Sequence, residues 1–302
     1  MGAVGYADDI ILMAPSQYAA QKMLRTCEKF ANDHNIRFST DADPSKSKSK
    51  VVYVTGPRGG GLQKPAPLQS CGRDLPWVAR AEHLGHTLTE DGTMRQDARE
   101  KRAQFIDCHV KTRETFDFAH PVEQLEAVEK YCCSLYGSNL YDYNDNEFGM
   151  ICSAWRTGVK LAWGVHRGCR TYLLQQVLAP GVISLRVNLL MRYRTFFQSL
   201  LDSPSPEVQV AVRLAARDLR SSVGSNLAIL RQESGGLDPW TVSAGKLKAA
   251  LIKKETVAVP AQDEWRIPLL RQLLAQKLKH FYDGDKVKEE SISRLIDSLV
   301  VN

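Results

Sequence analysis

Two adjacent carboxylates near the start of the chain, set between apolar runs, constrain its fold more than any other feature. Residues 6–9 read Tyr-Ala-Asp-Asp, and residues 10–13 read Ile-Ile-Leu-Met. The second run is apolar and partly β-branched, which favours a buried strand. Gly5 and the acidic pair interrupt the apolar pattern. We therefore expect a hairpin that presents Asp8 and Asp9 at a fixed place, with Tyr6 packed beside them.

A pair of carboxylates at such a turn suits Mg²⁺. This ion takes one or two protein carboxylates and completes its shell with water and substrate phosphates, so Asp8 and Asp9 are candidate metal ligands. Two-metal phosphoryl transfer, with ions roughly 3.5–4 Å apart, needs at least one further carboxylate. An Asp-Asp pair by itself is more often a solvated turn or a helix cap. The surrounding sequence has to decide between these interpretations.

Three further motifs follow in a recognisable order. Residues 14–16 (Ala-Pro-Ser) lead into an amphipathic segment, residues 44–50 (Pro-Ser-Lys-Ser-Lys-Ser-Lys) lead into Val-Val-Tyr-Val, and residues 83–86 read His-Leu-Gly-His. Together with the acidic turn, this order resembles the reverse transcriptases of non-LTR (LINE-type) retrotransposons. The resemblance is strongest over residues 1–95 and weaker beyond them.

The resemblance implies an α+β fold in three parts. Residues 1–92 would be a partial polymerase palm, built from short antiparallel strands and a helix. Residues 93–222 would form a helical thumb, and residues 223–302 a helical C-terminal region.

The resemblance also implies a chemistry, RNA-directed DNA synthesis. The partners would be an RNA template, a DNA primer and deoxynucleoside triphosphates, with Mg²⁺ as cofactor. Asp8 would be a metal ligand and Asp9 a weaker or indirect one, with Tyr6 beside them. Lys48 would neutralise or protonate the pyrophosphate leaving group, or else belong to a solvated basic loop. Residues 84 and 85 (Leu-Gly) would form the primer grip, since glycine allows close approach of the primer end; a plain strand with a bulge fits them equally.

The family places its fingers and its first metal-binding Asp before the acidic turn, and here only five residues precede Tyr6. We therefore expect the C-terminal part of such an enzyme, inactive by itself. The alternative is a relic of a decayed element, either inert or kept as a non-catalytic nucleic-acid-binding protein. An in-frame reading of the genomic sequence upstream would separate the two.

Positive charge is concentrated in one segment. Residues 153–231 hold eleven cationic and three acidic residues, a net charge of +8, whereas the whole chain carries +6. Ten of the eleven cations are arginine, whose planar fork suits phosphate oxygens, and aromatic residues lie between them. The segment is a candidate surface for a template–primer duplex; a helical core with a solvated basic face is the alternative. The candidate contacts are Arg156, Lys160, Arg167, Arg170, Arg192 and Arg194.

Composition excludes several other classes. The chain has 302 residues, 43% of them hydrophobic, with no apolar run of about 18 residues and no signal segment. Its seven cysteines form no Cys-x₂-Cys pair, which indicates reduced thiols and no zinc site. We expect no membrane partner and an intracellular location, cytoplasmic or nuclear. Composition gives no indication of oligomeric state.

Periodicity and breaker residues predict the regular elements. A Gly/Pro-rich stretch at 56–67 is read as an exposed loop without the ending of a phosphate-binding P-loop. Short strands are expected at 51–54, 68–71, 75–78 and 82–88. Helices are expected from residue 17 to about 31, over 94–116, after Pro121, and over 147–163, 170–179, 182–202, 205–222, 268–282 and 292–299.

Overall fold

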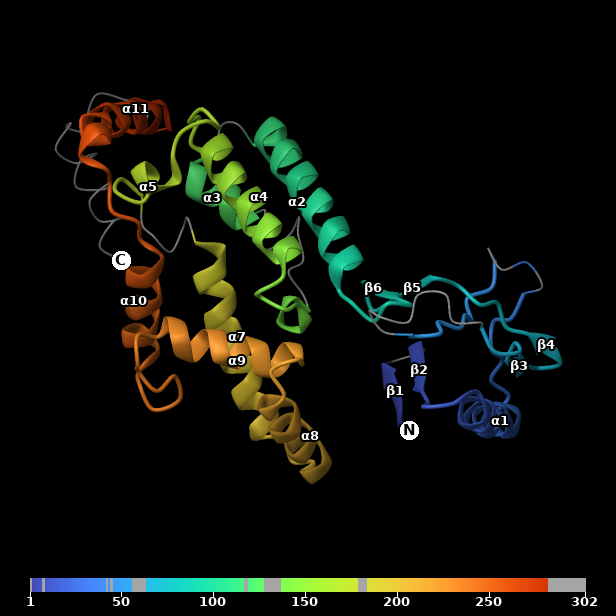
Figure 1. The fold of residues 1–302 in the computed structure, drawn as a ribbon. Helices are drawn as coiled ribbons and strands as arrows, with labels where there is room; N and C mark the ends of the chain where they lie inside the picture. Colours follow the sequence, from blue (N-terminus) through green and yellow to red (C-terminus); the bar gives the residue numbers. More distant parts are fainter. Residues whose placement is uncertain are drawn as a thin grey trace. The chain divides into compact units, whose positions relative to one another are not determined.

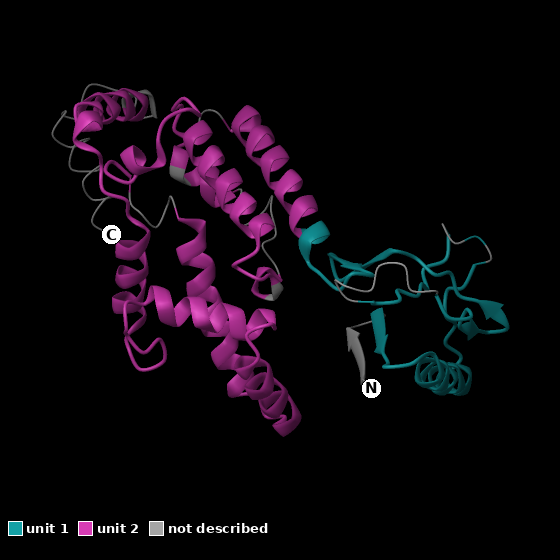
Figure 2. Ribbon diagram, in the orientation of Figure 1, with its two compact units in different colours: residues 1–97 teal, residues 98–302 magenta. Residues whose placement is uncertain are grey.

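A computed structural model gives the architecture of the chain (Figure 1). It describes residues 2–6, 9–41, 43, 46–55, 64–116, 119–127, 137–178 and 184–281. The chain divides into two compact units, residues 1–97 and 98–302 (Figure 2). The first contains short strand pairs and one helix, and the second is helical, so the α+β class is confirmed.

The first unit begins with the expected hairpin. Strand β1 (Gly2–Tyr6) pairs antiparallel with β2 (Asp9–Met13), with Tyr6 opposite Asp9. Helix α1 (Gln17–Asp33) follows, as predicted. Its N-cap is Ser16, whose hydroxyl accepts a hydrogen bond from the Ala19 amide at 3.2 Å. The cap stabilises the start of the helix, because this amide has no partner inside the helix.

Two more strand pairs complete this unit. They are β3 (Gln69–Ser70) with β4 (Arg73–Asp74), and β5 (Arg80–His83) with β6 (His86–Thr89), both antiparallel.

The strands predicted at 51–54 and 75–78 are wrong. Between these segments only an isolated parallel bridge forms, Val51 to Trp77. The Val51 amide donates to the Pro76 carbonyl at 3.0 Å, and the Val78 amide donates to Val51 at 2.9 Å. Because proline has no amide hydrogen, Pro76 cannot donate to a ladder, and the pairing remains a single bridge.

The second unit is a set of helices, and the first residues of α2 still belong to the first unit (Figure 2). Their bounds are α2 Arg95–Thr115, α3 Pro121–Ala127, α4 Asn146–Ala162, α5 Thr171–Leu174, α7 Leu185–Leu201, α8 Pro206–Arg217, α9 Ser222–Glu233, α10 Ala244–Glu255 and α11 Arg266–Phe281, with 3₁₀ turns at Ser138–Leu140 and Ala261–Asp263.

Aromatic rings fill the core of the helical unit. Phe105 of α2 stacks on Trp155 of α4 with ring centroids 5.5 Å apart, and Tyr143 stacks on Phe148 at 4.3 Å. Tyr193 of α7 is fully buried and lies edge-on to Tyr143 at 5.9 Å. These rings pack against protein, so they do not offer free faces to nucleobases.

Most predicted helices are confirmed, with three corrections. The helix expected over 205–222 is two helices, α8 and α9, separated by residues 218–221. The one expected over 170–179 is a single turn, α5, and α10 was not expected. The predicted helix at 292–299 lies outside the described residues, as does the segment 128–136.

Candidate functional site

The structure brings only part of the predicted metal site into view. Asp9 is exposed at the first position of β2, and its register partner Tyr6 ends β1. Asp8 lies outside the described residues. Within the described part of the chain, no group of three or more His, Cys, Asp or Glu residues could hold a metal ion.

Lys48 lies in an irregular segment and not on a strand. It is exposed, and so are Lys46 and Lys50. The neighbouring Ser49 amide donates to the Ser39 carbonyl at 3.1 Å, which ties the segment to the chain after α1. Lys46 pairs with Asp43 at 3.8 Å. The alternation of the three lysines therefore does not place them on one face of a strand.

Leu84 and Gly85 form the two-residue turn between β5 and β6. Both have positive φ, 49° and 75°, as in the hairpin turns that match strand twist. The turn is followed by His86, whose ring nitrogen Nδ1 lies 3.0 Å from the Asp97 carboxylate. The same carboxylate accepts a hydrogen bond from the Thr87 amide at 2.9 Å. The pair thus sits at a tight, anchored turn and not at a strand bulge.

Two of the six candidate phosphate contacts are used inside the protein. The Lys160 ammonium is buried and donates to the Arg167 carbonyl at 3.0 Å, and burial lowers its pKa. The Arg194 guanidinium donates to the carbonyls of Pro239 and Val242, at 2.5 and 3.2 Å. Both cations hold loops onto helices and are poorly placed to meet phosphate.

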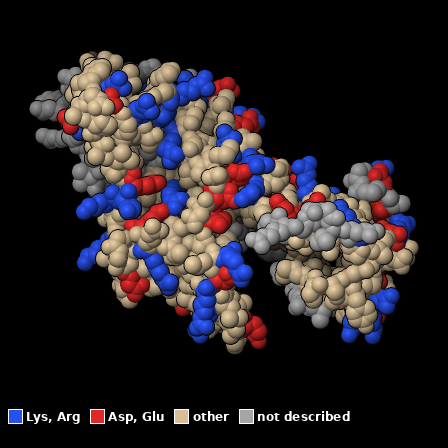
Figure 3. Space-filling model, in the orientation of Figure 1, with Lys and Arg blue, Asp and Glu red and all other residues tan. Residues whose placement is uncertain are grey.

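Three of the remaining candidates, Arg167, Arg170 and Arg192, are exposed. Arg156 is half-buried and donates to the Ser153 hydroxyl at 2.9 Å. On the face of the helical unit drawn in Figure 3, basic side chains are interspersed with acidic ones. The net positive charge of the segment is therefore not one uninterrupted patch on that face.

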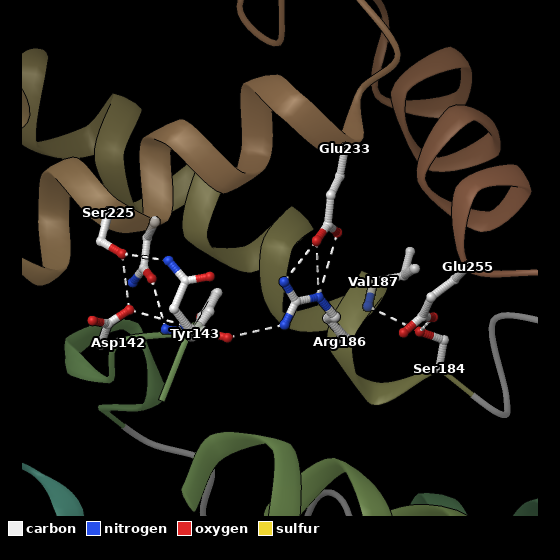
Figure 4. Close-up of polar contacts among 10 residues, drawn as sticks. Asp142, Tyr143, Ser184, Arg186, Val187, Ser225, Glu233 and Glu255 are labelled. Atoms are coloured by element: carbon white, nitrogen blue, oxygen red, sulfur yellow. Dashed lines mark hydrogen bonds and ion pairs between the residues drawn. The ribbon is translucent and has the colours of Figure 1, made fainter. Parts of the chain in front are cut away.

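A polar network that the sequence did not reveal joins the helices of this unit (Figure 4). The Arg186 guanidinium pairs with the Glu233 carboxylate of α9 at 2.6 Å and also donates to the Tyr143 carbonyl at 3.0 Å. Ser184 hydrogen-bonds Glu255 of α10. Arg186 contributed to the basic segment in sequence, yet its charge is neutralised by a residue 47 positions away.

His109 is the most perturbed histidine in the described structure. It is 5% exposed on α2, edge-on to Phe105 at 4.8 Å, and no hydrogen-bond partner lies near its Nε2 within the described chain. Gly158 of α4 faces the ring so closely that a Cβ there would lie 2.2 Å from it. Burial lowers the pKa of His109 to about 4. The imidazole is therefore neutral and part of the core.

This histidine predicts a pH dependence of stability. In the unfolded chain its pKa returns to about 6.5, so between pH 4 and 6.5 the unfolded state binds more protons and stability rises with pH. The full difference is about 3 kcal/mol. We expect urea unfolding to show a flatter pH dependence across this window for His109→Leu than for the unmodified protein. Identical slopes would contradict a neutral, buried His109.

No family model, curated protein or solved structure matches this chain. None of the helices in the described ranges is both long and apolar enough to cross a lipid bilayer.

Proposed function

We propose that the chain is part of an RNA-directed DNA polymerase, the reverse transcriptase of a non-LTR retrotransposon. Its Asp8–Asp9 turn would supply carboxylates to a magnesium site, and its helical unit would contact the template–primer duplex. In this reaction the primer 3′-oxygen bonds to the α-phosphorus of a deoxynucleoside triphosphate. The bond to the bridging oxygen breaks, and pyrophosphate leaves.

The observation that carries the proposal is the register of the first hairpin. Asp9 opens β2 directly opposite Tyr6, the last residue of β1. This supports the proposal, because one of the two acidic residues stands at the end of a strand pair, and metal ligands need to be held by regular elements. Asp9 is exposed there and open to an ion.

The magnesium ion fits the chemistry of the donors, since Mg²⁺ prefers carboxylate oxygens and retains waters and phosphates in its shell. When bound, it would supply electrostatic stabilisation at the transferred phosphoryl group. Asp8 and Asp9 would hold it. Arg167, Arg170 and Arg192, all exposed, are the favoured phosphate contacts, in place of Lys160 and Arg194.

Paramagnetic Mn²⁺, a stand-in for Mg²⁺, tests the proposal on the full chain. We expect Mn²⁺ to broaden the amide NMR signals of β1 and β2 selectively, because a bound ion would sit at the turn between them. The double variant Asp8→Asn, Asp9→Asn removes two anionic ligands and should abolish the broadening.

The matched control is Asp41→Asn with Asp43→Asn, which removes the same charge from another exposed acidic pair. Its Mn²⁺ response should equal that of the unmodified chain. Broadening that survives the loss of Asp8 and Asp9, or that never occurs, would favour a non-catalytic relic. We also expect no primer extension by the chain alone, since two-metal transfer needs a further carboxylate and the described residues hold no cluster of three metal-binding side chains. Extension abolished by Asp8→Ala would contradict that expectation.

A further inference from the structure

We propose that the outward face of α1 is a binding surface for single-stranded nucleic acid, which it grips through the phosphate backbone. The inference goes beyond the proposed function, because it uses neither the acidic turn nor the arginines of the helical unit. It rests on four side chains of one helix and on how that helix is fixed.

Three cations and one aromatic residue lie in a single stripe along α1. Tyr18, Lys22, Arg25 and Lys29 occupy positions i, i+4, i+7 and i+11, which share one face of an α-helix. At 1.5 Å per residue the stripe is about 16 Å long. All four residues are exposed. We call this set the α1 stripe.

One flank of α1, next to the stripe, is hydrogen-bonded to later segments of the same unit, so the stripe has a fixed orientation within that unit. Gln17 donates to the Ala66 carbonyl at 2.7 Å, and Gln21 exchanges two hydrogen bonds with the backbone of Gln69, at 2.8 and 2.9 Å. The Glu28 carboxylate accepts from the Cys71 amide at 2.6 Å. A helix held at both ends presents its outer side chains without further ordering, which reduces the entropic cost of binding.

The charges of the α1 stripe are not neutralised by the described protein. Lys22, Arg25 and Lys29 pair with no acid among the described residues, whereas Lys46 and Lys111 each pair with a nearby aspartate. Asp33 lies four residues after Lys29 and forms no ion pair with it. The α1 stripe ends at Lys29, before this acidic residue. Three adjacent unpaired cations attract a polyanion and release its counterions on binding.

An aromatic ring stands at one end of these cations. Tyr18, the first residue of the stripe, is 80% exposed. Exposed rings beside a cationic track are the usual means of holding unpaired bases, which stack on them irrespective of sequence. The combination favours a single strand over a duplex, whose bases are already stacked.

An anionic membrane is a poorer match for this face. Helices that lie in a bilayer interface insert an aliphatic and aromatic face, and the α1 stripe carries Tyr18 but no aliphatic residue. The two buried residues of α1 are the small Ala19 and Ala31, and the exposed Phe30 lies on another face of the helix than the stripe.

Fluorescence anisotropy with a labelled single-stranded oligouridylate tests the inference on the full chain. We expect Lys22→Ala, Arg25→Ala and Lys29→Ala together to weaken binding ten-fold or more. The slope of log K against log salt should fall by about 2, since each phosphate contact on a single strand contributes about 0.7. The triple variant Lys246→Ala, Lys253→Ala, Lys254→Ala removes the same charge from exposed positions of α10 and should change affinity less than two-fold.

Two further measurements locate the contact. Tyr18→Ala should weaken binding of the single strand more than Tyr18→Phe, because the ring and not the hydroxyl stacks. A 4-thiouridine oligonucleotide should crosslink to the peptide containing α1, and a deoxyoligonucleotide arm compares DNA with RNA.

The inference is overturned if the α1 variant binds like the α10 variant, or if it loses only binding to phosphatidylserine vesicles. Circular dichroism of each variant establishes that the fold is retained. Failure of Mn²⁺ to bind the acidic turn would count against the proposed function and leave this result unchanged.

Discussion

Gly224→Ala is expected to destabilise the helical unit by about 3 kcal/mol or more, at the upper end of what overpacking costs. Gly224 lies in the first turn of α9, and an added Cβ would be 2.3 Å from the carbonyl oxygen of Asp218 and 3.0 Å from that of Ala215. Both are backbone atoms at the end of α8, so no side-chain rotation relieves the clash. The α8–α9 turn would have to open.

The Ser221 side chain helps to close that turn. The Ser221 hydroxyl caps α9 by accepting from the Gly224 amide at 2.9 Å, and it lies 2.7 Å from the carbonyl oxygens of Ala215 and Asp218. A displaced Gly224 would therefore also weaken the cap, which is worth about 1 kcal/mol. Both effects act on the same turn, so they are coupled and do not simply add.

Urea unfolding followed by tryptophan fluorescence measures the effect. Four of the five tryptophans belong to the helical unit, so the signal reports mainly on it. Gly149→Ala is the matched control. Gly149 is exposed on α4 and nothing lies within 4 Å of an added Cβ, so alanine should stabilise by roughly 0.5–1 kcal/mol. Equal effects of the two variants would contradict the tight turn.

Local signals in the sequence predicted the helices and strands well where the stabilising contacts come from residues a few positions away. Ser16 and Ser205 cap the helices that follow them, and Pro206 fits the first turn of α8. A hairpin was expected at the acidic pair because apolar runs flank it, and β1 and β2 do pair there as a hairpin. These features depend on residues within a few positions, which a single sequence displays.

Long-range pairing was not predictable in the same way. Arg192 and Arg194 lie two positions apart on α7, yet the first is exposed while the second donates to carbonyls 45 and 48 residues later. Arg186 meets Glu233 across two helices. Nothing in the sequence separates an arginine that binds a carbonyl from one that faces solvent, so the phosphate contacts were over-assigned. Helical spacing could have indicated the α1 stripe, since the sequence already predicted an amphipathic helix from residue 17 to about 31.

Asn226→Ala should also destabilise the helical unit by about 3 kcal/mol, because two buried backbone groups would lose their partners at roughly 1–3 kcal/mol each. Asn226 is fully buried on α9. Its amide oxygen accepts from the Tyr143 amide at 2.9 Å, and its nitrogen donates to the Tyr141 carbonyl at 2.7 Å. This one side chain thus makes two hydrogen bonds to the backbone of the segment before α4, as a neighbouring strand would.

Hydrogen exchange separates this mechanism from general loosening of the fold. In Asn226→Ala the Tyr143 amide should lose protection more than the amides of α10 do, because only the former has lost its acceptor. Asn144→Ala is the control. Asn144 is exposed and hydrogen-bonds the Ser225 hydroxyl at 2.9 Å, so its loss should cost about 1 kcal/mol or less.

Asn226→Asp should be as damaging as alanine, since a carboxylate can accept from Tyr143 but cannot donate to the Tyr141 carbonyl. If the aspartate variant matched the unmodified protein, the donated hydrogen bond would not be what holds this segment to α9.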